Sequence, residues 1–226
     1  MLAAIALIPS APIVVPELAG AAADEVADLR AAVLTAAAVL PPRWIAIGVG
    51  PTDAVIPPSA AGTFAGYGAE IPVRLSAQAD GPVTALPLPA LIAGWVRARV
   101  NTDAVAEVRV YADIGAAAAD RGAALRAELD ETSDPVGVLV IADGANTLTE
   151  SAPGGFDPDS VSVQAALDDA LAAGDADALS RCAEGAVGQA AYQVLAGLVG
   201  ARPVRATELY RGAPFGVGYF AGTWLR

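Results

Sequence analysis

Three short apolar runs constrain the fold of this chain more than any other feature of its sequence. They occupy residues 2–8, 43–50 and 136–143, and each is followed by glycine, proline or polar residues. Continuous apolar runs of this length, ended by turn residues, are typical of strands buried on both faces of a sheet. The sequence therefore predicts a sheet with both faces covered.

The segments between these runs predict helices that connect parallel strands. Residues 21–40 have Asp24 and Glu25 in their first turn, apolar residues near helical spacing, and Pro41 at their end, as expected of a helix. A strand, a helix and a strand in this order favour a parallel pair. Further helices are predicted over residues 91–100, 116–129, 163–173 and 176–198, further strands over 105–111, 203–210 and 217–224, and a long loop over 51–81. We expect one α/β domain over residues 1–226.

The charged residues exclude several classes of function. The chain is acidic, with 25 Asp and Glu against 13 basic residues and a net charge of −12, which argues against nucleic acid and anionic membranes as partners. It has no histidine, and every basic residue is arginine. A histidine base, a lysine Schiff base and a P-loop lysine are therefore excluded. The single Cys182 excludes an internal disulfide and a multi-cysteine metal site.

Much of the apolar content comes from alanine rather than from membrane-spanning segments. Hydrophobic residues make up 55% of the chain, but aromatic residues only 5%. No uninterrupted apolar run reaches the ~20 residues that a spanning helix needs. The apolar start is interrupted by Pro9, Pro12 and Pro16, and it lacks the basic segment of a signal peptide. We therefore expect an alanine-rich, cytoplasmic protein with no membrane partner.

The loops after the three apolar runs are predicted to share one edge of the sheet. Ligands of open α/β sheets bind beyond the carboxyl ends of parallel strands, here the loops after Ile8, Val49 and Ala142. The last loop, DGANTLTESAPGGFDP (residues 143–158), carries acids, an amide, hydroxyls and a glycine pair. The acids of this loop are interpreted first as ordinary turn and helix-cap residues. A metal site with oxygen ligands stays open as the alternative. Its candidate ligands are Asp53, Asp143, Glu150, Asp157 and Asp159.

Single residues give weaker signals. Ser10 lies at a strand end, but the chain has no G-x-S-x-G motif and no histidine to activate it, so a loop hydroxyl is favoured over a nucleophile. Cys182 falls in a predicted helix and is interpreted as an inert thiol. The G-x-G pairs in GVGPTDA and APFGVGYFAG lack the full dinucleotide motif, and no dinucleotide is predicted.

Four segments together resemble the LigB family, the class III extradiol ring-cleavage dioxygenases with their Memo-like relatives. They are LIPSAPIVVPELAG, GVGPTDAV, VLVIADGANTLTESAPGGFDPD and APFGVGYFAG, and they occur in the family's order over almost the whole chain. The loop LTESAPGGFDP and the tail APFGVGYFAG are the most specific pieces. The resemblance implies a single three-layer α/β domain, in which a mostly parallel mixed sheet has helices on both faces.

The resemblance also implies which residues stand where the family's enzymes hold their metal. Those enzymes are similar in a non-haem Fe(II) site of two histidines and a carboxylate. The first histidine position falls on Ser10 and the second on Val49, and a further acid–base histidine aligns with Asn146. The late acidic position falls near residues 186–187, with Glu184 as a close substitute. Without imidazole donors, ring-cleavage activity is not expected, and the chain is interpreted as a metal-free pseudoenzyme without a cofactor.

Where the family's enzymes hold their metal, this chain is predicted to have a degenerate pocket, with Trp44 as a further apolar wall. Its predicted residues are Ser10, Val49, Asp143, Asn146, Tyr192, Phe215 and Tyr219. Three hypotheses follow. In the first, the chain is a non-catalytic module that binds a small organic ligand or a protein. In the second, it is an oxidoreductase or hydrolase in which Asp143 and Glu184 hold a different divalent metal. In the third, it is a structural subunit of a homo-oligomer or of a complex with another protein, and its pocket is vestigial.

Overall fold

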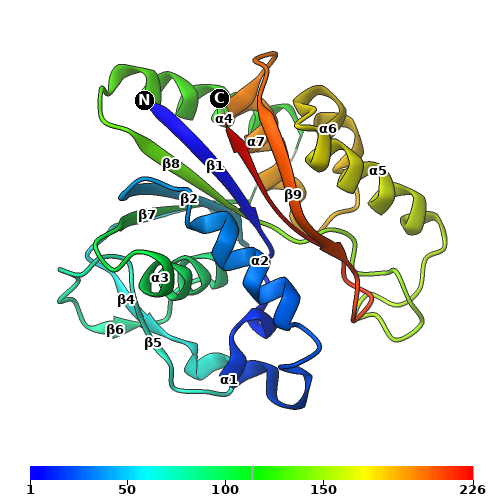
Figure 1. The fold of residues 1–226 in the computed structure, drawn as a ribbon, viewed down its shortest axis with the longest axis horizontal. Helices are drawn as coiled ribbons and strands as arrows, with labels where there is room; N and C mark the ends of the chain where they lie inside the picture. The colour runs from blue at the N-terminus through cyan, green and yellow to red at the C-terminus, as the bar shows by residue number, and fades with distance from the viewer. Residues whose placement is uncertain (113–114, 226) are drawn as a thin grey trace.

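The computed structural model describes residues 1–112 and 115–225, and its centre is a mixed sheet of seven strands in the order β3-β7-β2-β8-β1-β10-β9 (Figure 1). A separate small sheet has the order β5-β4-β6. The strands are β1 (Leu2–Ile8), β2 (Arg43–Val49), β3 (Ala54–Ile56), β4 (Ala61–Thr63), β5 (Pro72–Arg74), β6 (Val83–Thr84), β7 (Val105–Tyr111), β8 (Val136–Ile141), β9 (Arg205–Gly212) and β10 (Tyr219–Leu225).

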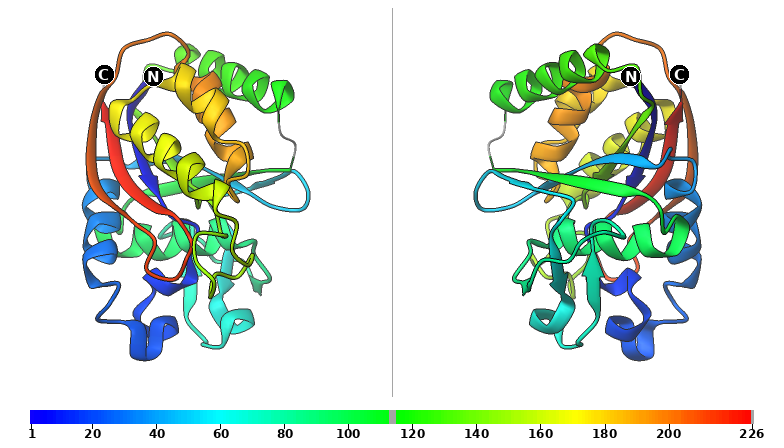
Figure 2. Two further views of the ribbon diagram at one scale, coloured as in Figure 1. Left: turned by 90° about the vertical axis from the view of Figure 1, so that its right-hand side faces the viewer. Right: turned by 90° about the vertical axis from the view of Figure 1, so that its left-hand side faces the viewer.

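Helices cover both faces of the large sheet. They are α1 (Pro16–Ala19), α2 (Ala27–Ala37), α3 (Leu88–Val100), α4 (Ala116–Glu131), α5 (Asp159–Ala173), α6 (Ala176–Cys182) and α7 (Gln189–Val199). Figure 2 shows the blue α2 on one side of the sheet and the green, yellow and orange helices α4, α5 and α7 on the other. The predicted three-layer α/β fold is therefore confirmed.

The strands alternate their side chains between two hydrophobic cores. In β1, Ala4, Ala6 and Ile8 contribute to the core under α2 and α3, whereas Ile5 and Leu7 contribute to the core under α4 to α7. A strand with both faces buried has no polar positions, which explains the continuous apolar runs of β1, β2 and β8.

The four central strands run parallel, so their carboxyl ends meet at one edge. β8 pairs in parallel with both β1 and β2, and β2 pairs in parallel with β7. Ile141 lies opposite Ile8 on one side and Gly48 on the other. The chain leaves β1 and β8 toward opposite faces of the sheet, which makes this edge a switch point of the topology.

Three predictions of local structure were wrong. The predicted loop 51–81 contains β3 and two strands of the small sheet. The helix predicted from residue 21 begins at Ala27; it is preceded by a short 3-10 turn, Gly20–Ala22, and by Ala23, whose carbonyl accepts a hydrogen bond from Arg30. The helix predicted over 176–198 is interrupted between α6 and α7, where Gly185 has a φ of 81° that few other residues adopt. Among the described residues, no helix is long and apolar enough to span a membrane.

Candidate functional site

Asp143 lies at the centre of the strand-end edge. It lies two residues after the end of β8, and the Ala142 amide between them donates to the Ile8 carbonyl at 2.9 Å. One carboxylate oxygen of Asp143 accepts the Ser10 backbone N–H at 2.7 Å, and the residue is only 9% exposed. Burial raises the pKa of Asp143 from 3.8 to about 7, and the Ser10 amide opposes that rise. This carboxyl therefore titrates close to neutral pH.

Two tyrosines lie near enough to this carboxyl for its charge to act on them. Tyr192, from α7, is buried and donates its hydroxyl to the Ala142 carbonyl at 3.0 Å. Tyr219 is the first residue of β10 and is also buried. Burial and then the Asp143 charge raise the pKa of both phenols. Both tyrosines are therefore neutral hydrogen-bonding groups rather than bases.

The glycines of the APFGVGYFAG segment let it pair with the loop after β8. The Gly144 amide donates to the Gly218 carbonyl, and the Gly218 amide donates to the Ala145 carbonyl, both at 2.8 Å. The Gln164 side chain packs against both glycines: a Cβ on Gly144 would lie 2.1 Å from its amide oxygen, and a Cβ on Gly218 would lie 2.3 Å from it. A side chain at either position would therefore have to displace the buried Gln164 amide, which accepts the Ala145 amide and donates to Asp168.

A row of buried polar side chains on α5, which we call the polar stripe, contacts the loop after β8. The sequence analysis did not predict it. Ser160, Gln164 and Asp168 follow one another at a spacing of four, and all three are buried. Gln164 accepts the Ala145 amide and donates to the Asp168 carboxylate, both at 2.8 Å. Burial raises the pKa of Asp168 to about 6. The i, i+4, i+8 spacing of polar residues is a signal by which the stripe could have been found.

The other predicted pocket residues lie near the edge but are half-buried. Ser10, Val49, Asn146 and Phe215 have intermediate exposure. The Asn146 carbonyl accepts the Gly154 amide at 2.9 Å, which folds the loop back on itself.

Trp44 is not a wall of this site, which corrects the prediction. It lies at the amino end of β2 and donates to the Pro41 carbonyl. Five residues separate it from Val49, a strand length of ~16 Å.

Glu184 and Asp143 lie in different surroundings. Glu184 is exposed and lines a groove of about 340 Å³ with side chains of α5 and α6, whereas Asp143 is buried. Asp53 lies in another pocket, of about 550 Å³, where it accepts the Ala112 amide and pairs with Arg121. Within residues 1–112 and 115–225, no three Cys, Asp or Glu residues are placed to hold a metal ion.

The Asp143 carboxyl can hold a proton near neutral pH, but the polar groups around it are hydrogen-bonded to other groups of the chain. The Asp143 carboxylate binds a loop amide, Tyr192 binds a carbonyl, and Gln164 joins the loop to Asp168. The strand ends thus form a packed polar junction between the two faces of the sheet.

Comparisons with known proteins found a structure of similar fold but no protein of known activity. No protein-family model matches the chain, and no curated protein matches it. Among solved structures, the chain is similar to the uncharacterized protein JW3007 from Escherichia coli K12, with a TM-score of 0.58 and 12% sequence identity. That match covers 98% of this chain and 99% of the other, so the two share their fold over their whole lengths.

Proposed function

We propose that this chain is a non-catalytic LigB-like protein whose function is to bind another protein. The observation that supports this proposal is the packed state of the strand-end edge. Asp143, Tyr192 and Tyr219 are all buried, and the hydrogen bonds of Asp143 and Tyr192 are made within the chain. A site that binds substrate needs polar groups that converge on an open cavity. Here the same groups join loops to one another.

The residues at this edge do not fit the Fe(II) centre of the dioxygenases that the chain resembles. A facial triad needs two imidazoles and a carboxylate around open coordination positions. Val49 offers no donor atom, and Ser10 and Asn146 offer only neutral oxygen or amide groups. Asp143 is buried and already accepts the Ser10 amide. No iron-dependent step is assigned to this chain.

An anaerobic calorimetric titration with Fe(II), Mn(II) and Zn(II) tests the metal-free part of the proposal. We expect no saturable binding near one equivalent, and in a separate aerobic assay of the metal-loaded protein we expect no catechol-dependent oxygen uptake. A saturable site that is lost in Asp143→Asn but retained in Asp24→Asn, which removes an exposed carboxylate, would overturn the proposal. Binding retained in both variants would place the metal away from the strand ends and would equally contradict it.

A further inference from the structure

A groove opens at one edge of the seven-stranded sheet, between β3, β7 and α4. The pocket of about 550 Å³ that contains Asp53 forms one part of it, and a cavity of about 90 Å³ that shares Glu107 and Arg109 with this pocket forms the other. Together they follow β7 from Val105 to Tyr111, roughly 20 Å of extended chain. Figure 2 shows β3, in light blue, and the green β7 at this edge, with α4 above them. We call this feature the β3–β7 groove.

The alternation of side chains in β3 and β7 explains why this part of the sheet is open. Val55 lies opposite Arg109 in the antiparallel pair, so it shares with Glu107, Arg109 and Tyr111 the face that is turned toward α4. On the other face, Ile56 is buried in the core under α2 and α3. Val55, in contrast, is 65% exposed. Helix α4 therefore leaves the outer part of its face of the sheet uncovered.

One buried group that lines the groove has no acceptor for its proton. Tyr111 is only 8% exposed. Burial raises the pKa of its hydroxyl, and the Arg109 guanidinium beside it opposes that rise. A guanidinium can only donate hydrogen bonds, so it can bind the phenol oxygen but cannot accept the phenol proton. Within residues 1–112 and 115–225, no other group is hydrogen-bonded to this hydroxyl. The hydroxyl is therefore available to an acceptor from outside the chain.

The charged groups of the groove are already paired within the chain. Arg109 pairs with Glu107 and with Glu128 of α4, and Arg121 pairs with Asp53. A charged side chain from outside would have to displace one of these pairs or be buried without a partner. An uncharged oxygen can accept the available hydroxyl proton without disturbing them. The groove therefore fits an uncharged group.

We propose that the β3–β7 groove binds an extended, uncharged segment of a partner protein, which accepts the Tyr111 hydroxyl through a backbone carbonyl or an amide side chain. About six residues of extended chain match the length of the groove. Apolar side chains of such a segment can contact the exposed Val55. This inference rests on the proposed function, and it names the surface and the chemistry of the partner.

The edge of the sheet beside the groove can pair with such a segment. β3 is the last strand on its side of the sheet, so within the described structure its outer edge pairs with no strand. Edge strands that avoid pairing commonly carry charges or bulges. The other edge strand, β9, has both, with Glu208, Arg211 and a shifted register against β10, whereas β3 has no charged side chain. Extended peptides are recognised by main-chain hydrogen bonds to such an edge and by pockets for alternate side chains.

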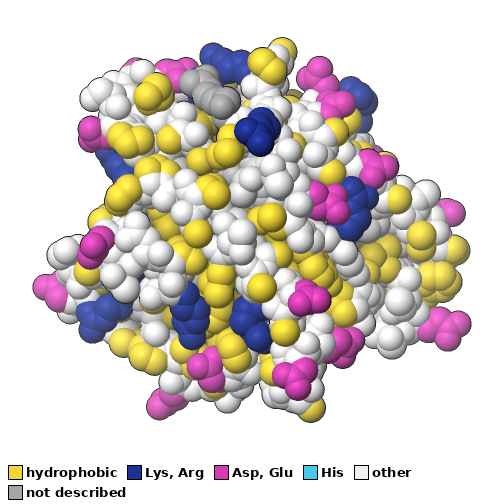
Figure 3. Space-filling model, viewed as in Figure 1, with side chains coloured by type: hydrophobic (Ala, Val, Ile, Leu, Met, Phe, Trp, Pro, Cys, Tyr) yellow, Lys and Arg dark blue, Asp and Glu magenta, His cyan; other side chains and the backbone are white. Residues whose placement is uncertain are grey.

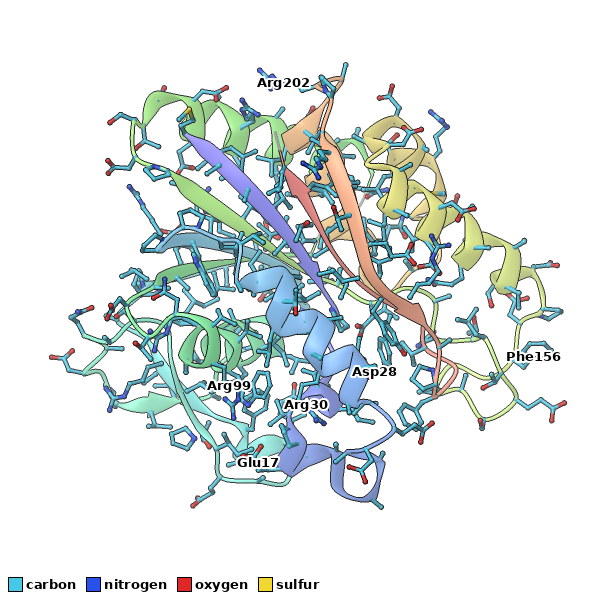
Figure 4. The ribbon with its side chains drawn as sticks, in the orientation of Figure 1. Glu17, Asp28, Arg30, Arg99, Phe156 and Arg202 are labelled. Atoms are coloured by element: carbon cyan, nitrogen blue, oxygen red, sulfur yellow. The ribbon has the colours of Figure 1, made fainter. Side chains whose placement is uncertain are left out.

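The other side of the molecule, which carries α2 and α3, presents charged groups that the chain itself uses. Glu17, Arg30 and Arg99 project there from α1, α2 and α3 (Figure 4), and Figure 3 shows acidic and basic side chains interspersed with hydrophobic ones. Arg30 donates to two backbone carbonyls, and the guanidinium carbon of Arg99 lies 3.8 Å from the centre of the buried Trp95 ring. These arginines are held by the chain, and we assign no docking surface to them.

Selection from a phage-displayed library of random heptapeptides on the immobilised full chain tests the groove. We expect enriched sequences that lack charged residues at their centre and that bind the wild type in solution. Tyr111→Phe should weaken the binding of these peptides by about 10-fold in Kd, because it removes the donor of a hydrogen bond. Tyr67→Phe is the matched control: Tyr67 is 45% exposed in the 3-10 turn after β4, and its change should leave the Kd unaltered.

Val55→Glu is a second test, which does not alter the buried tyrosine. Val55 is 65% exposed, and substitutions at exposed positions usually change stability little. The added carboxylate should weaken the same peptides by at least ~10-fold in Kd, because an uncharged segment would cover it without pairing it. Val83→Glu is the matched control, because Val83 is 57% exposed on β6, in the small sheet, and this change should leave the binding intact.

Three results would overturn the assignment of the groove. They are a selection that enriches no sequence, enriched peptides that bind Tyr111→Phe or Val55→Glu as tightly as the wild type, and enriched peptides with charged residues at their centre. Each of these results leaves the metal-free proposal intact, because the metal titration does not involve this groove. Specific metal binding at Asp143 contradicts that proposal whatever peptides are selected.

Discussion

Replacing Asp143 by asparagine should stabilise the folded protein at neutral and alkaline pH. The change keeps the shape of the side chain and an oxygen that accepts the Ser10 amide, but it removes a charge that the fold buries. Burial is the main cause of the raised pKa of Asp143, so the ionised form is less stable in the folded chain than in the unfolded chain.

The sign and size of the effect follow from the two pKa values. Because the folded pKa of about 7 lies above the ordinary value of 3.8, the folded protein holds more protons between these values. The free energy of unfolding therefore falls as the pH rises through this window, and the loss is complete above the folded pKa. At ~1.36 kcal/mol per pKa unit, the full loss is at most ~4 kcal/mol. The asparagine side chain of the variant does not titrate and escapes this loss.

Urea unfolding of the wild type and of Asp143→Asn between pH 4 and pH 8 measures the difference. We expect similar stabilities at the acidic end and a growing advantage of the variant that levels off near pH 8. Asp168, whose pKa is about 6, is present in both proteins, so its contribution cancels in the comparison. Asp24→Asn, at an exposed position, should show no such trend. A difference between wild type and Asp143→Asn that is independent of pH would refute the assignment of a raised pKa to this buried carboxyl.

Three further changes test the packing of the strand-end junction and of the contact between α4 and α7, each by urea unfolding against the wild type. Tyr192→Phe leaves the carbonyl after β8 without its hydroxyl donor and should cost ~1–2 kcal/mol; no loss would mean that water replaces the phenol. Gln164→Leu removes the acceptor of the Ala145 amide and should cost ~2–3 kcal/mol; an equally stable variant would contradict the role of the polar stripe. Gly197→Ala places a Cβ 2.0 Å from the backbone of α4 and should cost ~1–3 kcal/mol, whereas Gly66→Ala, with no atom within 4 Å, should be neutral.

The central strands could be predicted because their burial leaves a continuous apolar signal. The runs predicted at 2–8, 43–50 and 136–143 became β1, β2 and β8 with the amino ends as predicted. Because parallel strands end at one edge, the proximity of Ser10 to Asp143 also followed from the sequence. Local periodicity carries this information without any knowledge of distant contacts.

The strand β7 was also predicted with its bounds, but the small sheet and several element boundaries depend on contacts between distant residues. β4, β5 and β6 are only two or three residues long, which is too short for a periodic pattern to be recognised in the sequence. The predicted start of α5 at residue 163 missed its first turn, where Ser160 donates to the Asp157 and Thr147 carbonyls. Trp44 lies at the amino end of β2, the end opposite the site, and an apolar run in the sequence does not show which of its ends a ligand site would adjoin.

The position of β1 in the large sheet affects how the chain can be assembled during synthesis. β1 is made early, yet its two neighbours are β8 and the C-terminal β10. At ~5–20 residues per second, translation delivers β10 on the order of 10 to 40 s after β1. Throughout that interval an apolar strand lacks at least one of its pairing partners, and such unpaired strands promote aggregation. Shielding of β1 until β10 has been made would therefore lower the risk of aggregation.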